Sequence, residues 1–565
     1  MAELLLRNGI VYDPLNAING ERMDIAVKDG KIVSRVSRKA RVLNASGMIV
    51  MPGGVDIHSH IAGSKVNVGR MLRPEDHEKD VEAKTAVTRA GVGYSIPSTF
   101  TTGYRYSRLG YTTVFEPATP PLKTRHTHEE LNDTPMIDKA CFPLFGNNWF
   151  VMEYLKEGRI DECAAYIAWM LNATKGYAIK IVNPGGVEAW HWGRNVAGLD
   201  DEVPNFGITP REIVRGLCKI NKMLNLPHTI HLHTNNLGKP GNYRTTIETM
   251  DCVRDLATHG RPNIHITHVQ FCCFSGTSWI NLGSGAPEVA DYVNKHQHVT
   301  IDPGQLVFTD TTTMTADGPF QYILYRLSGN KWVNADVEAE TGAGIVPFRY
   351  KKSNYVNAIQ WGTALELMLL VKDPWKIYLT TDHPNAGPFT EYPRVISWLM
   401  SKKAREKLIA KINKNARRRL DLPSIDREYT FSEIAIVTRA GTAKALALRN
   451  KGHLGVGADA DIAVYDIDMR KVDPPKDYVL VRRALKRAAY TIKEGEVLVK
   501  NGEVVQSAIG KTYWVNSKVS ENLMNKVATD LRAKFEDYYS IRMDNYPVEE
   551  EFLAASREIK VKSEV

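Results

Sequence analysis

Apolar and polar positions alternate over short distances near both ends of the chain. The segments 4–14 and 24–36 have the pattern of strands that turn at Asn-Gly and Asp-Gly pairs, and 41–53 adds another strand. The same alternation returns at 455–468 and 488–505. The pattern predicts one small β domain built from both ends of the chain.

The long middle of the chain alternates between strand-like apolar runs and segments with helical periodicity. The strand-like runs include GYAIKIV, HTIHLHT, NIHITHVQF, HVTIDPG and WKIYLTTDH, and the helical segments include 209–224 and 357–371. This alternation predicts a parallel α/β fold, and a (β/α)8 TIM-like barrel with insertions fits its length.

These changes in pattern divide the chain into four parts. We expect the N-terminal part of the β domain at 1–52, the barrel at 53–425, the C-terminal part of the β domain at 426–510 and a helical extension at 511–565.

The composition narrows the class of protein. Hydrophobic residues make up 43% and charged residues 24% of the 565 residues, as in soluble globular proteins. No apolar run approaches the ~18 residues of a membrane span. The first residues show no basic leader or cleavage pattern, so we expect a cytoplasmic protein. The six cysteines are scattered without a Cys-x-x-Cys pair, which argues against a disulfide framework and a cysteine-ligated cluster.

The formal net charge of +9 raises the question of a nucleic-acid partner. The densest basic segment, 401–422, has apolar residues at helical spacing, so we expect an amphipathic helix with a solvated basic face. No recognised nucleic-acid module accompanies it. The charge favours an anionic substrate or an acidic partner protein, and no nucleic acid.

The first candidate for chemistry is a pair of histidines at the end of the apolar run 47–57. His58 and His60 are two positions apart, and side chains at i and i+2 of a strand point to the same face. Their imidazoles would therefore meet at one point. Two hydrogen-bonded core histidines would give the same pattern, so the rest of the chain must decide.

Further polar residues stand at or near the ends of later strand-like runs, where the chemistry of a (β/α)8 barrel gathers. They are His231, His233, His265, His268 and Asp382, and Lys180 stands in the middle of the apolar strand GYAIKIV. Most have an ordinary explanation, because strand histidines are often core residues and Asp-His-Pro-Asn favours a turn. Lys180 is harder to explain, since an unpaired ammonium between two isoleucines would be expensive to bury.

A buried Lys180 can take part in metal binding. Burial lowers the pKa of a lysine, and the neutral amine can react with carbon dioxide to form a carbamate whose two oxygens bridge two divalent cations. Four imidazoles, this carbamate and Asp382 predict a two-metal site. Ligands of this kind, without thiolate, favour zinc, with manganese, iron or nickel as alternatives. Asp382 would act as general base and then as general acid toward a leaving amine.

The chain carries a clear resemblance to a known family. The β-bracketed barrel with VDIHSH, a strand lysine, two later strand histidines and a strand-end TDH resembles the amidohydrolase superfamily, near its hydantoinase and dihydroorotase branch. Longer stretches are similar to the amidohydrolase-type subunits of formylmethanofuran dehydrogenases from methanogenic and related archaea, over nearly the whole chain. These stretches are 51–70, 116–135, 176–186, 231–243 and 380–393.

The resemblance implies an activity and partners. In that family a subunit with a tungsto- or molybdopterin reduces carbon dioxide to formate. This chain would condense formate with the amine of methanofuran, or hydrolyse N-formylmethanofuran in reverse, in the first step of carbon dioxide reduction in methanogenesis. The implied partners are that metallopterin subunit, scaffold subunits and polyferredoxin-type subunits with iron–sulfur clusters, so this chain itself would hold two Zn²⁺ and no redox centre.

The resemblance also implies the site residues. The implied metal ligands are His58, His60, Lys180 carboxylated at N6, His233, His268 and Asp382, of which Asp382 is also catalytic. His231 and His265 stay open as alternatives, because each shares a strand face with, or lies close to, the chosen histidine. Asn235, Asn236 and His191 are candidates for substrate binding.

Other interpretations stay open. The chain could be the hydrolase subunit of a formyltransferase/hydrolase complex that releases formate, a free-standing hydantoinase-like cyclic amidohydrolase, or a non-catalytic scaffold. Asn235 stands where a hydantoinase would show glutamate, which argues against a ring-amide substrate. A second His-x-His pair, His126 and His128, lacks a preceding apolar strand, so we interpret it as a loop or helix start.

Overall fold

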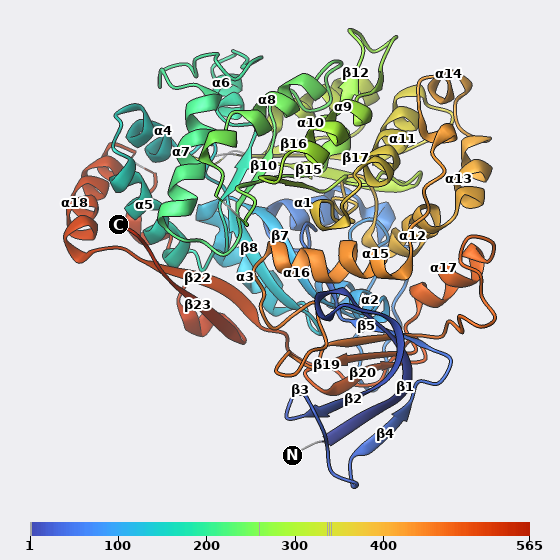
Figure 1. Ribbon diagram of the computed structural model, residues 1–565. Coiled ribbons are helices and arrows are strands. Elements are labelled where there is room, and N and C mark those ends of the chain that lie inside the picture. The colour runs from blue at the N-terminus through green and yellow to red at the C-terminus, as the bar shows by residue number, and fades with distance from the viewer. Residues whose placement is uncertain (1–2, 259, 336, 338, 341, 539) are drawn as a thin grey trace.

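One sheet of the protein is built from both ends of the chain (Figure 1). The computed structural model describes residues 3–258, 260–335, 337, 339–340, 342–538 and 540–565. The strand order is β21-β20-β19-β18-β5-β1-β2-β3, with β4 beside β1. These strands are β1 (Glu3–Asp13), β2 (Ile18–Lys28), β3 (Lys31–Val33), β4 (Arg41–Asn44), β5 (Ile49–Pro52), β18 (Ile462–Tyr465), β19 (Tyr490–Lys493), β20 (Glu496–Lys500) and β21 (Glu503–Val504). The two ends meet where β5 pairs with β18 in antiparallel fashion.

The turns of this sheet follow the sequence with one exception. Asp29-Gly30 and Asn501-Gly502 adopt positive φ at both positions, as tight hairpin turns require. The expected turn at Asn8-Gly9 is wrong, because β1 continues through these residues. Asn8 instead takes a positive φ of 62° beside a register shift, so the pair forms an irregularity within one long strand.

The second part of the fold is a barrel of eight parallel segments. They are β6 (Gly54–Asp56), β7 (Tyr111–Thr119), β8 (Asp138–Pro143), β9 (Lys180–Val182), β10 (Ile230–His233), β11 (Ile264–Ile266), β14 (Val299–Ile301) and the segment 377–383. Ladders join β6 to β8 and β9 to β14, and single parallel bridges link Leu144 to Lys180, Ile301 to Ile377 and Ser59 to His383. The expected (β/α)8 barrel is confirmed, and it brings the carboxyl ends of its strands to one rim.

Helices follow the barrel strands along the chain. They are α1 (Ser64–Leu72), α2 (Thr99–Arg108), α3 (Thr124–Asn132), α4 (Trp149–Lys156), α5 (Ile160–Ala173), α6 (Gly186–His191), α7 (Pro210–Met223), α8 (Tyr243–Asp251), α9 (Ala286–Lys295), α11 (Tyr355–Leu370) and α12 (Tyr392–Met400). The two helices expected from periodicity are α7 and α11. A capping box of Thr209 and Glu212, with Pro210 at the first helical position, explains why α7 begins there.

The basic segment 401–422 is not one helix, as expected, but two. Ser401 caps α13 (Lys402–Ile409), and Asn413 accepts from two backbone N–H groups to cap α14 (Lys414–Arg417). Because Ser401 and Asn413 each cap the start of a helix, the segment forms two short helices with a non-helical turn between them.

An insertion covers part of the barrel rim. It contains the antiparallel strands β15 (Asp310–Thr315), β16 (Val333–Ala335) and β17 (Ala343–Arg349) and helix α10 (Gly318–Ser328). Figure 1 places it on the side of the barrel away from the nine-stranded sheet. It contacts the end of the eighth barrel segment, where the Tyr350 hydroxyl donates to the carbonyl of Asn385 at 3.0 Å.

The C-terminal extension is helical only in part, which corrects the expectation for 511–565. It contains α18 (Glu521–Asp537), but also β22 (Thr512–Lys518) and β23 (Ser556–Lys562), which extend the β6–β8 sheet in parallel. Tyr513 and Val515 of β22 are buried. The two side chains are buried because β22 joins the sheet beside β8 instead of standing alone.

The division of the chain at residues 52, 425 and 510 stays a proposal. The helical stretch 431–445, which this division gives to the C-terminal part of the β domain, packs with the barrel core through Phe431 and Ile434, and the first strand of that part is β18. A separate core cluster that includes Leu6, Val27 and Ile462 fills the β domain.

None of the described helices combines the length and apolar character needed to cross a membrane.

Candidate metal centre

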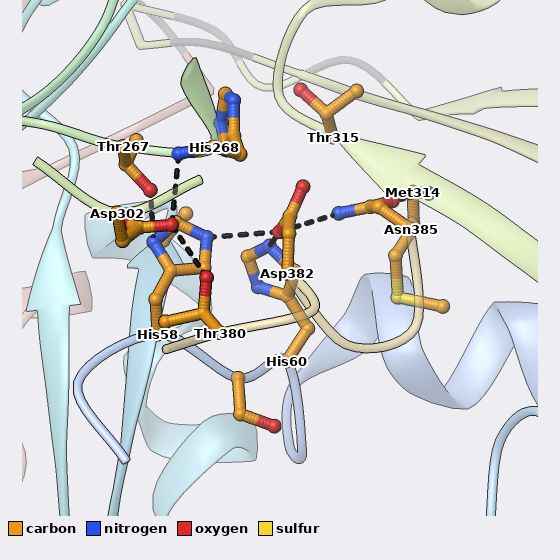
Figure 2. A network of polar contacts seen from close by, with 12 residues as sticks. His58, His60, Thr267, His268, Asp302, Met314, Thr315, Thr380, Asp382 and Asn385 are labelled. Atoms are coloured by element: carbon orange, nitrogen blue, oxygen red, sulfur yellow. Dashed lines mark hydrogen bonds and ion pairs between the residues drawn. The ribbon is translucent and has the colours of Figure 1, made fainter. Parts of the chain in front are cut away.

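The first histidine pair enters the centre directly after β6. His58 and His60 are both buried, and the backbone N–H of His60 donates to the carbonyl of His383 at 2.7 Å. Asp56 holds the turn in place, because its Oδ1 accepts from the N–H of His58 and its Oδ2 from the hydroxyls of Tyr106 and Tyr392. The strand end therefore brings both imidazoles next to Asp382, as Figure 2 shows.

Asp382 lies between the two imidazoles (Figure 2). Its Oδ1 is 2.9 Å from Nε2 of His58 and 3.3 Å from Nε2 of His60. Asn385 Nδ2 donates to the same oxygen at 2.9 Å. The backbone of Asp382 has a φ of 46°, an uncommon conformation for a residue other than glycine. Burial raises the pKa of Asp382, which suits a group that exchanges a proton.

Glu116, in the second half of β7, orients His60. Its Oε1 lies 2.8 Å from Nδ1 of His60 and 3.1 Å from Nζ of Lys65. Burial opposes ionisation of Glu116, but Lys65 and His60 outweigh it and lower its pKa to about 2. This carboxylate takes the Nδ1 side of the ring and so leaves Nε2 facing Asp382. We did not select Glu116 from the sequence, although a glutamate directly after the apolar run TTVF was a signal.

Lys180 lies at the start of β9 and is 1% exposed. Its Nζ is buried and has no hydrogen-bond partner among the described residues. Burial lowers the pKa of Lys180 to about 7, against the opposing effect of Asp382. Lys180 also lowers the pKa of His58 by its charge, after the larger effect of burial. A neutral, unpartnered amine is therefore available within the cluster.

His268 lies just beyond β11 and next to Asp302 (Figure 2). Its backbone N–H donates to Asp302 Oδ1 at 2.9 Å, and its ring Nδ1 is buried without a hydrogen-bond partner in the described part of the chain. The rings of His58 and His268 are 5.4 Å apart. Gly304 packs against this residue at a φ of +58°, and a Cβ there would lie 2.5 Å from Cβ of His268.

His233, at the end of β10, has its ring 4.7 Å from that of His268. Its Nε2 lies 3.0 Å from Oδ2 of Asp317, which belongs to the insertion and caps α10. Asn183 Nδ2 donates to the other oxygen of Asp317 at 3.1 Å. We did not predict Asp317 from the sequence, because nothing in TADGPF indicates that the insertion folds over the rim.

The two alternative histidines have other partners. His231 lies between Nδ1 of His58 at 2.8 Å and Nε2 of His228 at 3.1 Å, so both of its nitrogens are engaged. His265 is engaged by the Thr300 hydroxyl at 2.9 Å and by Asp302 Oδ2 at 3.0 Å. A histidine with both nitrogens hydrogen-bonded has no lone pair to offer a metal ion.

Two groups of three side chains bring ligand atoms within 4.8 Å of one another among the described residues. They are His58, His268 and Asp382, and His58, His231 and Asp302. We favour the first group, because the nitrogens of His231 are engaged elsewhere. The centre thus contains a donor set that could hold a metal ion.

The expected substrate-binding residues are dispersed. Asn235 is buried and donates to Asn183 Oδ1 at 2.8 Å and to the carbonyl of Pro184 at 2.9 Å. Asn236 accepts from Lys239 Nζ at 2.9 Å. His191 lies on α6, 3.9 Å from the carboxylate of Glu188.

The second His-x-His pair lies on α3. His126 is 39% exposed, near Glu129 and Glu130, and His128 Nε2 hydrogen-bonds to the carbonyl of Thr174 at 2.9 Å. His126 thus contacts carboxylates of its own helix, and His128 packs the helix against the segment around Thr174.

A cavity of about 630 Å³ lies beside the centre. Phe271 lines it and has its ring 5.9 Å from that of His268, and Tyr350 lines it as well. Four cationic side chains and one carboxylate also line it: Arg73, Lys239, Arg349, Lys351 and Glu75. The excess of cationic side chains on its wall suits an anionic molecule.

Comparisons with known proteins agree with this geometry. Residues 41–499 match the amidohydrolase family. Protein FwdA of Methanocaldococcus jannaschii is 56% identical over 566 residues, 99% of both chains. FhcA, a component of the formyltransferase/hydrolase complex of Methylorubrum extorquens, is 36% identical over 545 residues, 94% of both chains. The crystal structure of FhcABCD from that bacterium in complex with methylofuran matches with a TM-score of 0.89 at 33% identity, covering 99% of both chains.

Proposed function

Because the chain belongs to the amidohydrolase family, we propose that it forms and hydrolyses the amide bond of an N-formyl compound. The substrates would be formate and the amine methanofuran, and the chain would be the amidohydrolase subunit of a formylmethanofuran dehydrogenase. The observation that carries this proposal is the buried cluster in which Asp382 faces Nε2 of His58 and of His60, beside the amine of Lys180, which has no hydrogen-bond partner in the described part of the chain.

The donor set of the cluster fits two Zn²⁺ ions. We propose as ligands His58, His60, Lys180, His233, His268 and Asp382. The free Nδ1 of His268 and the two Nε2 atoms that face Asp382 support this choice. When bound, such ions would polarise the formyl carbonyl and supply a nucleophile at neutral pH.

Lys180 would bridge the ions as an N6-carboxylated side chain. Its neutral Nζ attacks carbon dioxide, a nitrogen–carbon bond forms as one carbon–oxygen π bond opens, and the nitrogen releases a proton. The pKa of about 7 supports this step, because an amine that is half neutral near pH 7 is available for it.

Asp382 would move the proton. In condensation of formic acid with the neutral amine, it takes one proton from the attacking nitrogen and gives it to the hydroxyl group that formic acid loses as water. In hydrolysis it delivers a proton to the leaving amine. Its buried position and its raised pKa support both roles. Glu116 and Asp56 would not take part in the reaction, and would hold His60 and His58 in orientation.

Substrate would enter through the cavity beside the centre. Methanofuran carries several carboxylates, and Arg73, Arg349 and Lys351 on the cavity wall would attract them. We keep Asn235, Asn236 and His191 as proposed substrate contacts, although their observed partners are protein groups.

The proposed partners are those of a carbon-dioxide-reducing complex. They are a metallopterin-bearing subunit, scaffold subunits and polyferredoxin-type subunits with iron–sulfur clusters, in the cytoplasm. The multi-subunit FhcABCD relative supports the general arrangement.

Amide hydrolysis by the purified chain would test this function. N-formylmethanofuran is incubated with metal-free protein and with protein reloaded with Zn²⁺, and formate is measured. Formate release that depends on the metal, without any electron acceptor, is expected. No release from protein of verified zinc content would contradict the proposal.

A second candidate is the hydrolase subunit of a formyltransferase/hydrolase complex. The structural match to FhcABCD supports it, because the whole length of both chains aligns. The partner subunits distinguish the two: copurification of a metallopterin subunit supports the dehydrogenase, and copurification of a formyltransferase alone supports the alternative.

A further inference from the structure

Three buried histidines form a chain that ends on a backbone carbonyl. His228 Nδ1 lies 2.8 Å from the carbonyl oxygen of Ala445, and His228 Nε2 lies 3.1 Å from Nδ1 of His231. His231 Nε2 lies 2.8 Å from Nδ1 of His58. His228 and His231 are completely buried and His58 is 1% exposed, so no solvent molecule competes for these contacts.

The carbonyl of Ala445 decides which atom donates in each hydrogen bond of this row of histidines. Ala445 is the last residue of α16 (Gly441–Ala445), where helix carbonyls lack an intrahelical partner. A carbonyl only accepts, so His228 Nδ1 must carry a hydrogen and donate it. A neutral imidazole carries one N–H, so His228 Nε2 accepts from Nδ1 of His231, and His231 Nε2 accepts from Nδ1 of His58.

The rings are held in the neutral form. All three rings are buried away from solvent, where a charged imidazolium is expensive, and one N–H per ring satisfies the carbonyl and ring contacts. Three neutral rings carry three hydrogens, and the three contacts of the chain use all of them. Nε2 of His58 is left with a lone pair, 2.9 Å from Asp382 Oδ1.

We propose that His228 and His231 are positioning residues that hold His58 in the tautomer whose Nε2 can bind a metal ion, with the carbonyl of Ala445 as the anchor. The inference rests on the proposed metal-dependent function. It gives a role to His231, which the pattern of the sequence left as an alternative ligand, and to His228, which that pattern did not single out.

Neighbouring polar groups cannot do the same. The Thr267 hydroxyl lies 2.5 Å from Nδ1 of His58, but a hydroxyl can donate or accept and so accommodates either tautomer. His265 has its ring 4.6 Å from that of His231, yet its nitrogens are engaged by Thr300 and Asp302. Among these contacts of the described residues, the carbonyl of Ala445 is the one that forces a single direction on the hydrogen bonds.

Zinc affinity of the full-length chain tests the proposal. Wild type, His228→Leu and His228→Gln are stripped of metal, and their Zn²⁺ dissociation constants are measured by competition with a chromophoric chelator. We expect His228→Leu to bind zinc about 10- to 100-fold more weakly, as for other changes behind a metal-binding imidazole. The amide of His228→Gln offers an acceptor and a donor, so it should recover most of the affinity.

The matched control is His298→Leu. His298 is buried and its Nε2 hydrogen-bonds to the carbonyl of Met250 at 3.0 Å, outside the chain of histidines. Its loss should leave zinc affinity unchanged. Thermal unfolding verifies that each variant is folded, and His228→Phe, which keeps an aromatic ring without nitrogen, replaces His228→Leu if that variant does not fold.

The outcomes separate the two levels of the proposal. Folded His228→Leu with the zinc affinity of wild type would overturn the positioning role alone. An equal loss in His298→Leu would overturn it too, because the effect would then come from packing. Wild type without zinc affinity would overturn the proposed function, and the inference with it.

Discussion

His60 and Glu116 form a buried pair in which Nδ1 of the imidazole lies 2.8 Å from Oε1 of the carboxylate. The pair joins the ends of two neighbouring barrel segments, β6 and β7. It decides which nitrogen of His60 faces Asp382, and so it connects the packing of the barrel to the chemistry at its rim.

We expect Glu116→Gln to lower the free energy of unfolding at neutral pH. The variant keeps the shape of the side chain but leaves Lys65 buried without its counter-charge, at a cost of about 3–5 kcal/mol. The pKa of Glu116 is lowered from 4.5 to about 2 in the folded chain. The contribution of the ionised carboxylate to stability is therefore complete above pH 4.5 and is lost as the pH falls toward 2. Denaturant unfolding of both proteins at pH 7 and at pH 3 measures this. A constant difference at both pH values would contradict the expectation.

We expect metal loading to depend on carbon dioxide and pH through Lys180. Its pKa in the folded chain is about 7, so the neutral amine increases about tenfold per pH unit below that value and levels off above it. The rate of zinc uptake by the metal-free chain at a constant concentration of dissolved carbon dioxide, followed by the onset of activity, should have the same profile. Lys180→Met should show neither loading nor a response to bicarbonate. Full loading in buffer free of carbon dioxide would exclude the carbamate.

The lowered pKa of Lys180 also affects the stability of the metal-free chain. Lys180 has an unfolded pKa of 10.5, so between pH 7 and pH 10.5 the unfolded chain binds more protons than the folded one. Stability should therefore rise with pH in this window, by up to about 1.4 kcal/mol per unit, relative to Lys180→Met. Urea unfolding of both chains at pH 7 and pH 9 gives the difference, and parallel stabilities would rule the shift out.

Asp382→Asn should separate metal binding from proton transfer. The amide keeps the size of the side chain and can still offer an oxygen, but it cannot take up a proton. We expect kcat to fall by about 10²- to 10⁴-fold, the usual contribution of general acid–base catalysis. Elemental analysis should find most of the zinc retained by the histidines. Activity near that of wild type would assign the proton to another group.

Gly304→Ala should disturb His268 without removing any ligand. The new Cβ would lie 2.5 Å from Cβ of His268, at a φ that favours glycine. The chain must shift, so we expect a loss of about 1–3 kcal/mol in stability together with weaker zinc binding. Gly329→Ala is a suitable control, because it has a similar positive φ but open space around it. Zinc affinity lowered equally in both variants would argue against a specific contact.

Lys351→Glu should weaken the binding of an anionic substrate. Lys351 lines the cavity beside the centre, and reversing its charge should raise KM several-fold at low salt and leave kcat unchanged. Lys295→Glu provides a surface control, since Lys295 is 66% exposed on α9 and pairs with Asp291. Equal KM values for wild type and Lys351→Glu would show that the substrate approaches from another side.

Much of the fold and of the candidate centre could be predicted from local pattern. Alternation and turn pairs predicted the sheet built from both chain ends, since β pairing and tight turns depend on neighbouring residues. The predictions of a turn at Asn8-Gly9 and of one helix over 401–422 were wrong, because a bulge and a second cap compete locally with those structures. The strands in the C-terminal extension were missed, since their pairing partner β8 lies far away in sequence.

The sequence by itself determined the barrel class and the residue types at its rim: His58, His60 and Asp382 stand at the edge of an apolar run, and Lys180 stands within one. Only the tertiary structure decided which nitrogen of each ring is free. The carboxylates of Glu116, Asp317 and Asp302 engage one nitrogen each of His60, His233 and His265, and the carbonyl of Ala445 engages His228, all from other segments of the chain. Hydrogen-bond partners this distant follow from closure of the barrel, and no local spacing records them.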